Sequence, residues 1–116
     1  MNKKHFTLLI FLIISGSQLE AQQSQQEKNK EIALKFYHDL WANPTTEKYA
    51  ETVADTYVVH DIGDRKAVTE AAIEQKHIAD LFWENGELDF ELDYQVADGD
   101  LVATRWIAHF KPETLF

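Results

Sequence analysis

Two side chains in this sequence are suited to proton transfer or to binding a carbonyl oxygen. His60 ends a β-branched and aromatic segment, and an imidazole can accept or donate a proton near neutral pH. Arg105 lies in an apolar segment near the C-terminus, and a guanidinium can polarise a carbonyl or bind an acidic group. The structural alternatives are a histidine bonded to a backbone carbonyl and a buried ion pair of Arg105, for instance with Asp61.

The composition excludes several classes of protein. The chain has 116 residues, which is enough for one compact domain, and 20 acidic against 11 basic side chains give a net charge of −9. This acidic balance argues against nucleic-acid binding, and the absence of cysteine excludes disulfides and thiolate metal sites. His60, Asp61 and Asp64 resemble metal ligands, but no second histidine stands at ligand spacing, so we expect neither metal nor cofactor.

The first 21 residues have the order of a secretory signal peptide. Lys3 and Lys4 precede an apolar run at 6–14, which is too short to span a bilayer, and small residues follow up to Ala21. Cleavage after Ser17 and cleavage after Ala21 both fit. The pattern predicts export to the periplasm or the exterior, and an uncleaved anchor or a buried helix is the alternative. Residues 22–28 are then a polar, flexible lead-in to a domain over 29–116.

Hydrophobic spacing in the remainder predicts an α+β domain. An apolar stripe over 27–42 indicates an amphipathic helix that ends before Pro44, and the alternation of apolar and acidic residues over 88–96 indicates a half-buried strand. The other predicted elements are a short helix from Thr45 or Thr46 to about Ala54, a strand at 56–60, a turn at 61–64, a helix at 68–83 capped by Thr69, and a returning strand at 101–110.

The hairpin turn decides which side chains share a face of the sheet. With Asp98 and Gly99 as a two-residue turn, Arg105 and His109 lie on the apolar face of 88–96. Because a buried charge is costly, that face favours a polar-lined cavity over a dry core. The opposite face, which carries Trp106, is too apolar for solvent and is expected to pack against another layer or a second subunit. A one-residue bulge would exchange the two sets.

Three segments carry a family resemblance. Residues 36–41 (FYHDLW), 57–61 (YVVHD) and 96–106 (VADGDLVATRW) together resemble the SnoaL-like polyketide cyclases, or ester cyclases, of the nuclear transport factor 2-like superfamily, over about 29–116. The resemblance implies a cone in which N-terminal helices pack on a curved antiparallel sheet around a small-molecule pocket. It also implies cofactor-free proton transfer and aldol cyclisation on a carbonyl compound. Because many relatives only bind ligands, a non-catalytic ligand-binding or dimerisation module is the alternative.

The resemblance and the predicted faces together name the candidate site residues. His60 matches the histidine that faces the family's pocket, and with Arg105 it forms the catalytic pair. The substrate-binding candidates are Tyr37, Trp41, Phe90, Tyr94 and His109, although plain packing is the stronger interpretation for Tyr37 and Trp41. The family's acid/base carboxylate lies on strands beyond Phe116, so we expect a chain truncated at its C-terminus. The expected partners are an apolar or carbonyl ligand and a second copy, with no nucleic acid and no membrane for the mature form.

Overall fold

The computed structural model describes residues 3–60 and 67–114, with side chains described from Gly16 onward. The elements are, in order, α1 (Lys3–Tyr37), the π-helical turn η1 (His38–Ala42), the 3-10 helix η2 (Thr46–Glu51), β1 (Thr56–Val59), β2 (Val68–Ala71), α2 (Ile73–Asn85), β3 (Gly86–Asp98) and β4 (Leu101–Pro112). The described strands form two antiparallel hairpins, β1–β2 and β3–β4. Helices with antiparallel strands confirm the predicted α+β class.

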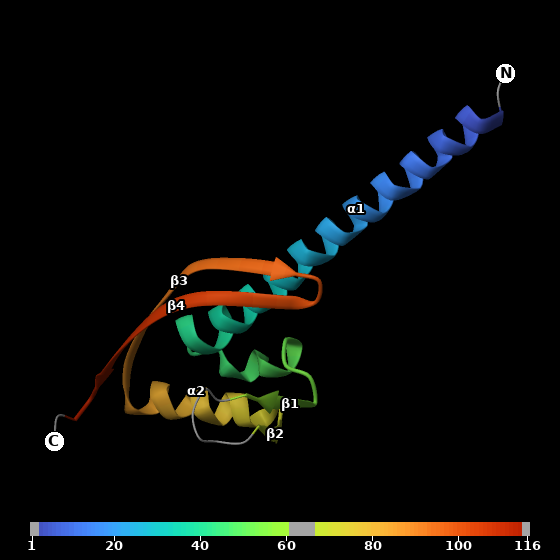
Figure 1. The fold of residues 1–116 in the computed structure, drawn as a ribbon. Coiled ribbons are helices and arrows are strands. Elements are labelled where there is room, and N and C mark those ends of the chain that lie inside the picture. Colours follow the sequence, from blue (N-terminus) through green and yellow to red (C-terminus); the bar gives the residue numbers. More distant parts are fainter. Residues whose placement is uncertain (1–2, 61–66, 115–116) are drawn as a thin grey trace.

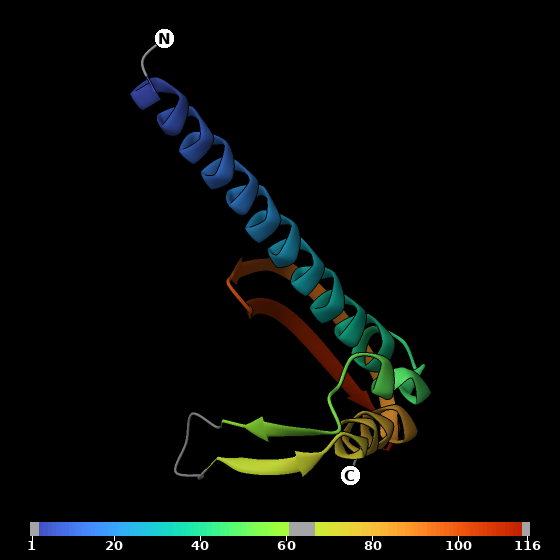
Figure 2. The ribbon, with the colours of Figure 1, turned by 90° about the vertical axis from the view of Figure 1, so that its right-hand side faces the viewer.

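The long β3–β4 hairpin packs against the end of α1 and against α2. In Figure 1 the β3–β4 hairpin runs beside the C-terminal half of α1, and α2 lies on the other side of that helix end. Figure 2 shows the small β1–β2 hairpin projecting away from α1 next to α2. Because α1 extends far beyond the other elements, the longest dimension is 83 Å against 28 and 26 Å for the other two.

The helix predicted over 27–42 is present, but its start and its last turn differ from the prediction. It begins far upstream, so residues 22–28 are helical, and its last turn widens into η1. Pro44 has no N–H to donate to the carbonyl of Leu40, and the indole of Trp83 supplies a hydrogen bond instead, with Nε1 to O at 2.8 Å. No helix in the described part of the chain combines the length and hydropathy needed to cross a membrane.

The second helix is shorter than predicted because a strand takes its first residues. Val68–Ala71 forms β2, which pairs with β1 from Thr56↔Ala71 to Val59↔Val68. Val68 and Thr69 are β-branched and favour an extended backbone, and β1 supplies hydrogen-bond partners for it. Thr69 is therefore not a helix cap, and α2 begins at Ile73. The predicted turn at 61–64 lies outside the described residues.

The core of the domain is small and lies where η1, η2 and α2 meet. Leu40 and Ala79 are fully buried in the described part of the chain. The hydroxyl of Thr46 donates to the Asp80 carboxylate, so this threonine joins η2 to α2 and does not cap its own helix. Lys76 pairs with the same carboxylate. These contacts hold η2 against α2, and η2 in turn packs against η1 at the end of α1, which carries the rings at 36, 37 and 41.

The register of the β3–β4 hairpin differs from the predicted one. The two loop residues are Gly99 and Asp100, and Gly99 has a φ of +58°, which suits a residue without Cβ. A β-bulge interrupts the ladder between Leu92 and Tyr94. On the turn side of the bulge, Tyr94 pairs with Arg105. On the other side, Leu92 pairs with Trp106, so the even-numbered side chains of β3 share a face with odd-numbered residues of β4 on the turn side and with even-numbered ones on the other side.

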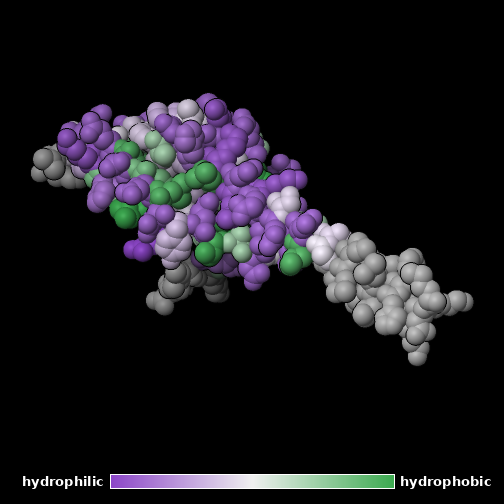
Figure 3. Space-filling view, turned by 90° about the horizontal axis from the view of Figure 1, so that it is seen from above, coloured by the Kyte–Doolittle hydropathy of each residue, from purple (hydrophilic) through white to green (hydrophobic). Residues whose placement is uncertain are grey.

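Because of the bulge, the residues of β4 that share a face with Leu88, Phe90 and Leu92 are not the predicted set but the other one. This is the consequence expected of a one-residue bulge. The inner face, toward α1 and α2, carries Leu88, Phe90 and Leu92 of β3 with Trp106, Ala108 and Phe110 of β4. The prediction that Arg105 and His109 share this face was wrong, and so was the placement of Trp106 on the opposite face. Viewed from above, the molecule is mostly hydrophilic, with hydrophobic side chains in separate small patches (Figure 3).

Candidate ligand-binding site

A cavity of about 820 Å³ lies between the end of α1, α2 and the inner face of the hairpin. We call it the aromatic cavity. Its lining comes from α1, η1, β1, α2, β3 and β4 and from His60 after β1: Phe36, Tyr37, Trp41, Val59, His60, Gln75, Phe82, Leu88, Phe90, Trp106, Ala108 and Phe110. The volume falls within the range of about 300 to 1,000 Å³ that holds drug-sized ligands in proteins.

One wall of the aromatic cavity is a stack of rings from three elements. Tyr37 of α1 stacks on Phe90 of β3, with ring centroids 5.6 Å apart. Phe90 in turn stacks on Trp106 of β4 at 5.4 Å. Offset or parallel rings at such distances attract one another beyond their buried area. Trp106 is still 49% exposed, so its indole remains available to a ligand.

The other wall consists of edge-to-face contacts. Phe82 of α2 packs its ring against Trp41 of η1 at 5.7 Å and against Phe110 of β4 at 5.2 Å. The π-helical turn and α2 thus reach the far end of the hairpin through Phe82. Together with Phe36, the walls present seven aromatic side chains around one space. Large apolar surface that solvent can reach in an acidic domain is a feature of ligand or partner sites.

Two polar side chains other than the tyrosine and the two tryptophans line the aromatic cavity. His60 follows β1 directly, and Gln75 lies in the first turn of α2. Behind Gln75, the hydroxyl of Tyr57 donates to Glu70, with oxygens 2.5 Å apart. Burial, and then this hydrogen bond, raise the pKa of Tyr57 above its ordinary value. No carboxylate occurs among the described residues that line the cavity.

Four of the seven predicted site residues meet in this cavity, namely Tyr37, Trp41, His60 and Phe90. The structure places the other three elsewhere. Arg105 lies on the outer face, where its Nη1 is 3.2 Å from Oδ2 of Asp93 and its side chain is 63% exposed. Tyr94 and His109 are exposed on the same face. The bulge beside Asp93 is the physical reason, because it turns these positions away from the helices.

Sequence reasoning did not assign Phe82, Trp106 and Phe110 to the site. The signal for the two strand residues was present, since the apolar set from 102 to 110 was too hydrophobic to face solvent. That set was assigned to packing or a subunit interface because the bulge was not included, and the one-residue error in the turn does not change which residues share a face. Phe82 was expected on the apolar side of its helix, and it does lie there, facing the cavity.

A buried carboxylate holds the π-helical turn beneath the cavity. The side chain of Asp39 is 3% exposed, accepts a hydrogen bond from Lys35, and has Oδ1 3.0 Å from Nδ1 of His38. The hydrogen bond from Lys35, and then that from His38, lower the pKa of Asp39. Lys35 also reaches Glu51 of η2 at 3.0 Å. This cluster is outside the aromatic cavity and fixes the helix end that carries Tyr37 and Trp41.

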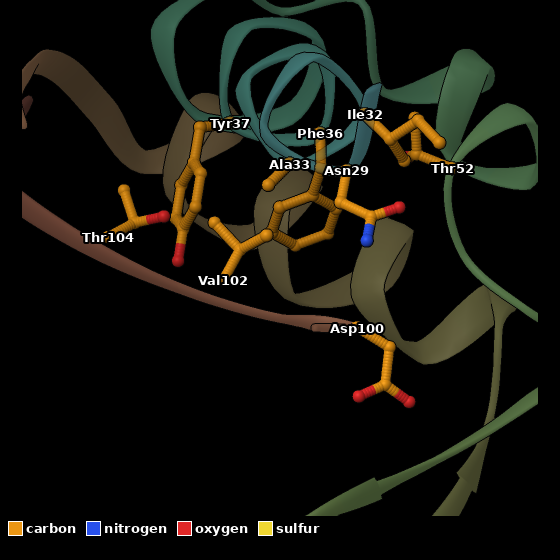
Figure 4. A pocket seen from close by; sticks show the side chains of 9 residues that line it. All are labelled: Asn29, Ile32, Ala33, Phe36, Tyr37, Thr52, Asp100, Val102 and Thr104. Atoms are coloured by element: carbon orange, nitrogen blue, oxygen red, sulfur yellow. The ribbon is translucent and has the colours of Figure 1, made fainter. Parts of the chain in front are cut away.

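A second cavity of about 380 Å³ lies between α1 and the turn end of the hairpin (Figure 4). It shares Phe36 and Tyr37 with the aromatic cavity, and its remaining lining is Asn29, Ile32, Ala33, Thr52, Asp100, Val102 and Thr104. Asn29 donates from Nδ2 to the carbonyl of Gly99 at 3.1 Å, which ties the hairpin turn to α1. No group of three or more potential metal ligands occurs among the described residues.

Helices packed on a long antiparallel hairpin around an aromatic cavity define an α+β domain. The family comparison agrees with this class. A family described as the SnoaL-like domain matches residues 33–115, which is well over half of the chain. The chain therefore belongs to the SnoaL-like domain family, within the nuclear transport factor 2-like superfamily. No curated protein and no solved structure matches the chain significantly.

Proposed function

We propose that this SnoaL-like domain binds a flat, largely apolar small molecule that carries a carbonyl group. The observation that supports the proposal is the aromatic cavity itself, with three stacked rings on one wall and edge-on rings on the other. Such surfaces complement a planar, conjugated ligand through stacking and apolar burial. His60 and Gln75 are the polar side chains that would orient a carbonyl oxygen.

Prodan, an environment-sensitive naphthalene ketone, is a suitable probe for this proposal because it is flat, apolar and carries one carbonyl. Added to the full chain, it should show the blue-shifted, brighter emission of an apolar site with saturable binding. Trp106→Ala removes a ring that stacks on the wall, and we expect about a tenfold loss of affinity.

Tyr94→Ala is the matched control because it removes an aromatic ring from the outer face. Circular dichroism of both variants establishes that they keep the fold. Non-saturable emission with the wild-type chain would contradict ligand binding in this cavity. Equal losses for Trp106→Ala and Tyr94→Ala would place the probe outside it.

A second function, proton transfer on the bound carbonyl compound, is favoured by one observation, the presence of His60 in the cavity lining. An imidazole next to a ketone could remove a proton from the adjacent carbon, while the Gln75 amide stabilises the enolate oxygen. The measurement is deuterium exchange of the acyl α-protons of prodan, followed by NMR. We expect exchange above the buffer rate that His60→Gln abolishes while prodan still binds. Exchange that survives His60→Gln would contradict the role of this histidine.

Export and self-association remain proposals of the sequence. We propose that residues 1–21 are a signal peptide, which the mass of the N-terminal peptide from exported protein would test. The sequence placed the dimer contact on the sheet face that carries Trp106, but this face lies toward the helices, so a dimer would instead use the outer face of the hairpin, where Tyr94 and Val96 are more than half exposed. A monomer mass in solution would contradict the dimer.

A further inference from the structure

The aromatic cavity and the second cavity adjoin through two side chains. Phe36 and Tyr37 line both spaces, and no other residue is common to them. The ring of Phe36 meets that of Tyr37 edge-on, with centroids 5.1 Å apart. The two spaces are therefore separated at this point by rings and not by a strand or a helix. Figure 4 shows both rings reaching from α1 toward β4, with Tyr37 beside Thr104.

Tyr37 is held by ring contacts alone. Its ring stacks on Phe90 within the aromatic cavity and meets Phe36 edge-on, and within the described part of the chain its hydroxyl forms no hydrogen bond that would anchor it from the other side. Across the ring, the second cavity mixes apolar side chains, such as Val102, with the hydroxyl of Thr104 and the amide of Asn29. A ligand that extends past Tyr37 would thus leave a ring-lined space and enter one whose apolar side chains can contact an alkyl chain.

We propose that the second cavity is an extension of the ligand site and that Tyr37 closes it, so that this side chain sets the length of the ligand. The wild-type chain then selects compact aromatic carbonyl compounds over homologues with a long acyl chain. This inference rests on the proposed ligand-binding function. It adds a subsite and a residue that determines specificity, with amphiphilic, extended aryl ketones as the class that an open extension accepts.

A matched pair of probes separates ring binding from chain length. Prodan and laurdan share one naphthalene ketone and differ only in the acyl chain, propionyl against dodecanoyl. Each is titrated into the full chain below its own aggregation limit, and the ratio of the two dissociation constants is the readout. Using the ratio removes any general effect of a variant on stacking with the naphthalene.

The expected result is a change of the ratio upon removal of the ring. In Tyr37→Ala the ratio should move in favour of laurdan by at least about tenfold, which is the gain from burying two further methylenes. Tyr37→Phe keeps the ring and should keep the wild-type ratio, whatever it does to each affinity. Tyr37→Leu, which retains apolar bulk for folding, should give an intermediate ratio. Tyr94→Ala, on the outer face, should leave both affinities unchanged.

The outcomes distinguish this inference from the function on which it rests. If the wild-type chain binds prodan and Tyr37→Ala leaves the ratio unchanged, Tyr37 does not limit length and the inference is overturned alone. The same conclusion follows if laurdan already binds the wild-type chain more tightly than prodan does. If neither probe saturates with the wild-type chain, the ligand-binding proposal itself fails. Circular dichroism and retained prodan binding verify that Tyr37→Ala is folded, and Tyr37→Leu decides the question if it is not.

Discussion

Substitution of Trp83 by phenylalanine should destabilise the domain through a single hydrogen bond. Nε1 of Trp83 donates to the carbonyl of Leu40 at 2.8 Å. In a regular helix the donor to that carbonyl would be the N–H of residue 44, which is a proline and has none. Leu40 is fully buried, so water cannot replace the indole. Trp83→Phe keeps an aromatic ring in place and removes the donor, leaving the buried carbonyl without it.

The expected cost is about 2 kcal/mol, because a buried polar group that loses its partner costs about 1 to 3 kcal/mol. Urea unfolding of the full chain, followed by far-UV circular dichroism, measures it as a lower midpoint with an unchanged m-value. Trp106→Phe is the matched control, since this indole is half exposed, and it should cost less than about 0.5 kcal/mol. Equal costs for the two variants would refute the assignment of stability to the bond between Trp83 and Leu40.

Three further substitutions test the elements that surround the cavity. Leu40→Ala, at a fully buried side chain, should cost about 2 to 5 kcal/mol in urea unfolding, and a cost below about 1 kcal/mol would contradict its place in the core. Asp39→Asn should destabilise at neutral pH. Because the pKa of Asp39 is lowered in the folded state, its contribution is complete above the ordinary value of 3.8 and is lost as the pH falls through the folded-state value. The difference between wild type and variant should therefore shrink in acid, and a pH-independent difference would contradict the ion pair with Lys35. Gly86→Ala should lower the thermal midpoint, since a Cβ there would lie 2.3 Å from the carbonyl oxygen of Lys111, and an unchanged midpoint would contradict this close approach.

The parts of the fold that the sequence predicted are those with a strong local period. The alternation of apolar and acidic residues over 88–96 identified β3, and the spacing of Phe36, Tyr37 and Trp41 identified the helix end. Four of the seven expected site residues follow from these two elements and from the strand before His60. For each of these residues, the hydrophobic pattern of its own segment is enough to predict which way the side chain points, and the pairing with another strand is not needed.

The parts that the sequence did not predict depend on partners distant in the chain. The bulge beside Asp93 has no glycine and no left-handed residue to mark it, yet it moves Arg105 and Tyr94 to the outer face. Likewise, Val68 and Thr69 fit the start of a helix or a strand, and pairing with β1 decides for the strand. One extra residue in a strand moves all side chains on one side of the bulge to the opposite face of the sheet. The site residues that were assigned from strand register alone were therefore the ones misplaced.

The central claim is that the aromatic cavity is the ligand site, and the three tryptophans provide the most direct test of it. Trp41 and Trp106 line the cavity, whereas the indole of Trp83 is bonded to Leu40. In a ¹H–¹⁵N spectrum each indole N–H gives one resolved peak, and titration with prodan should shift those of Trp41 and Trp106 while that of Trp83 stays in place. Saturation with prodan that leaves the Trp41 and Trp106 peaks unmoved would contradict the claim.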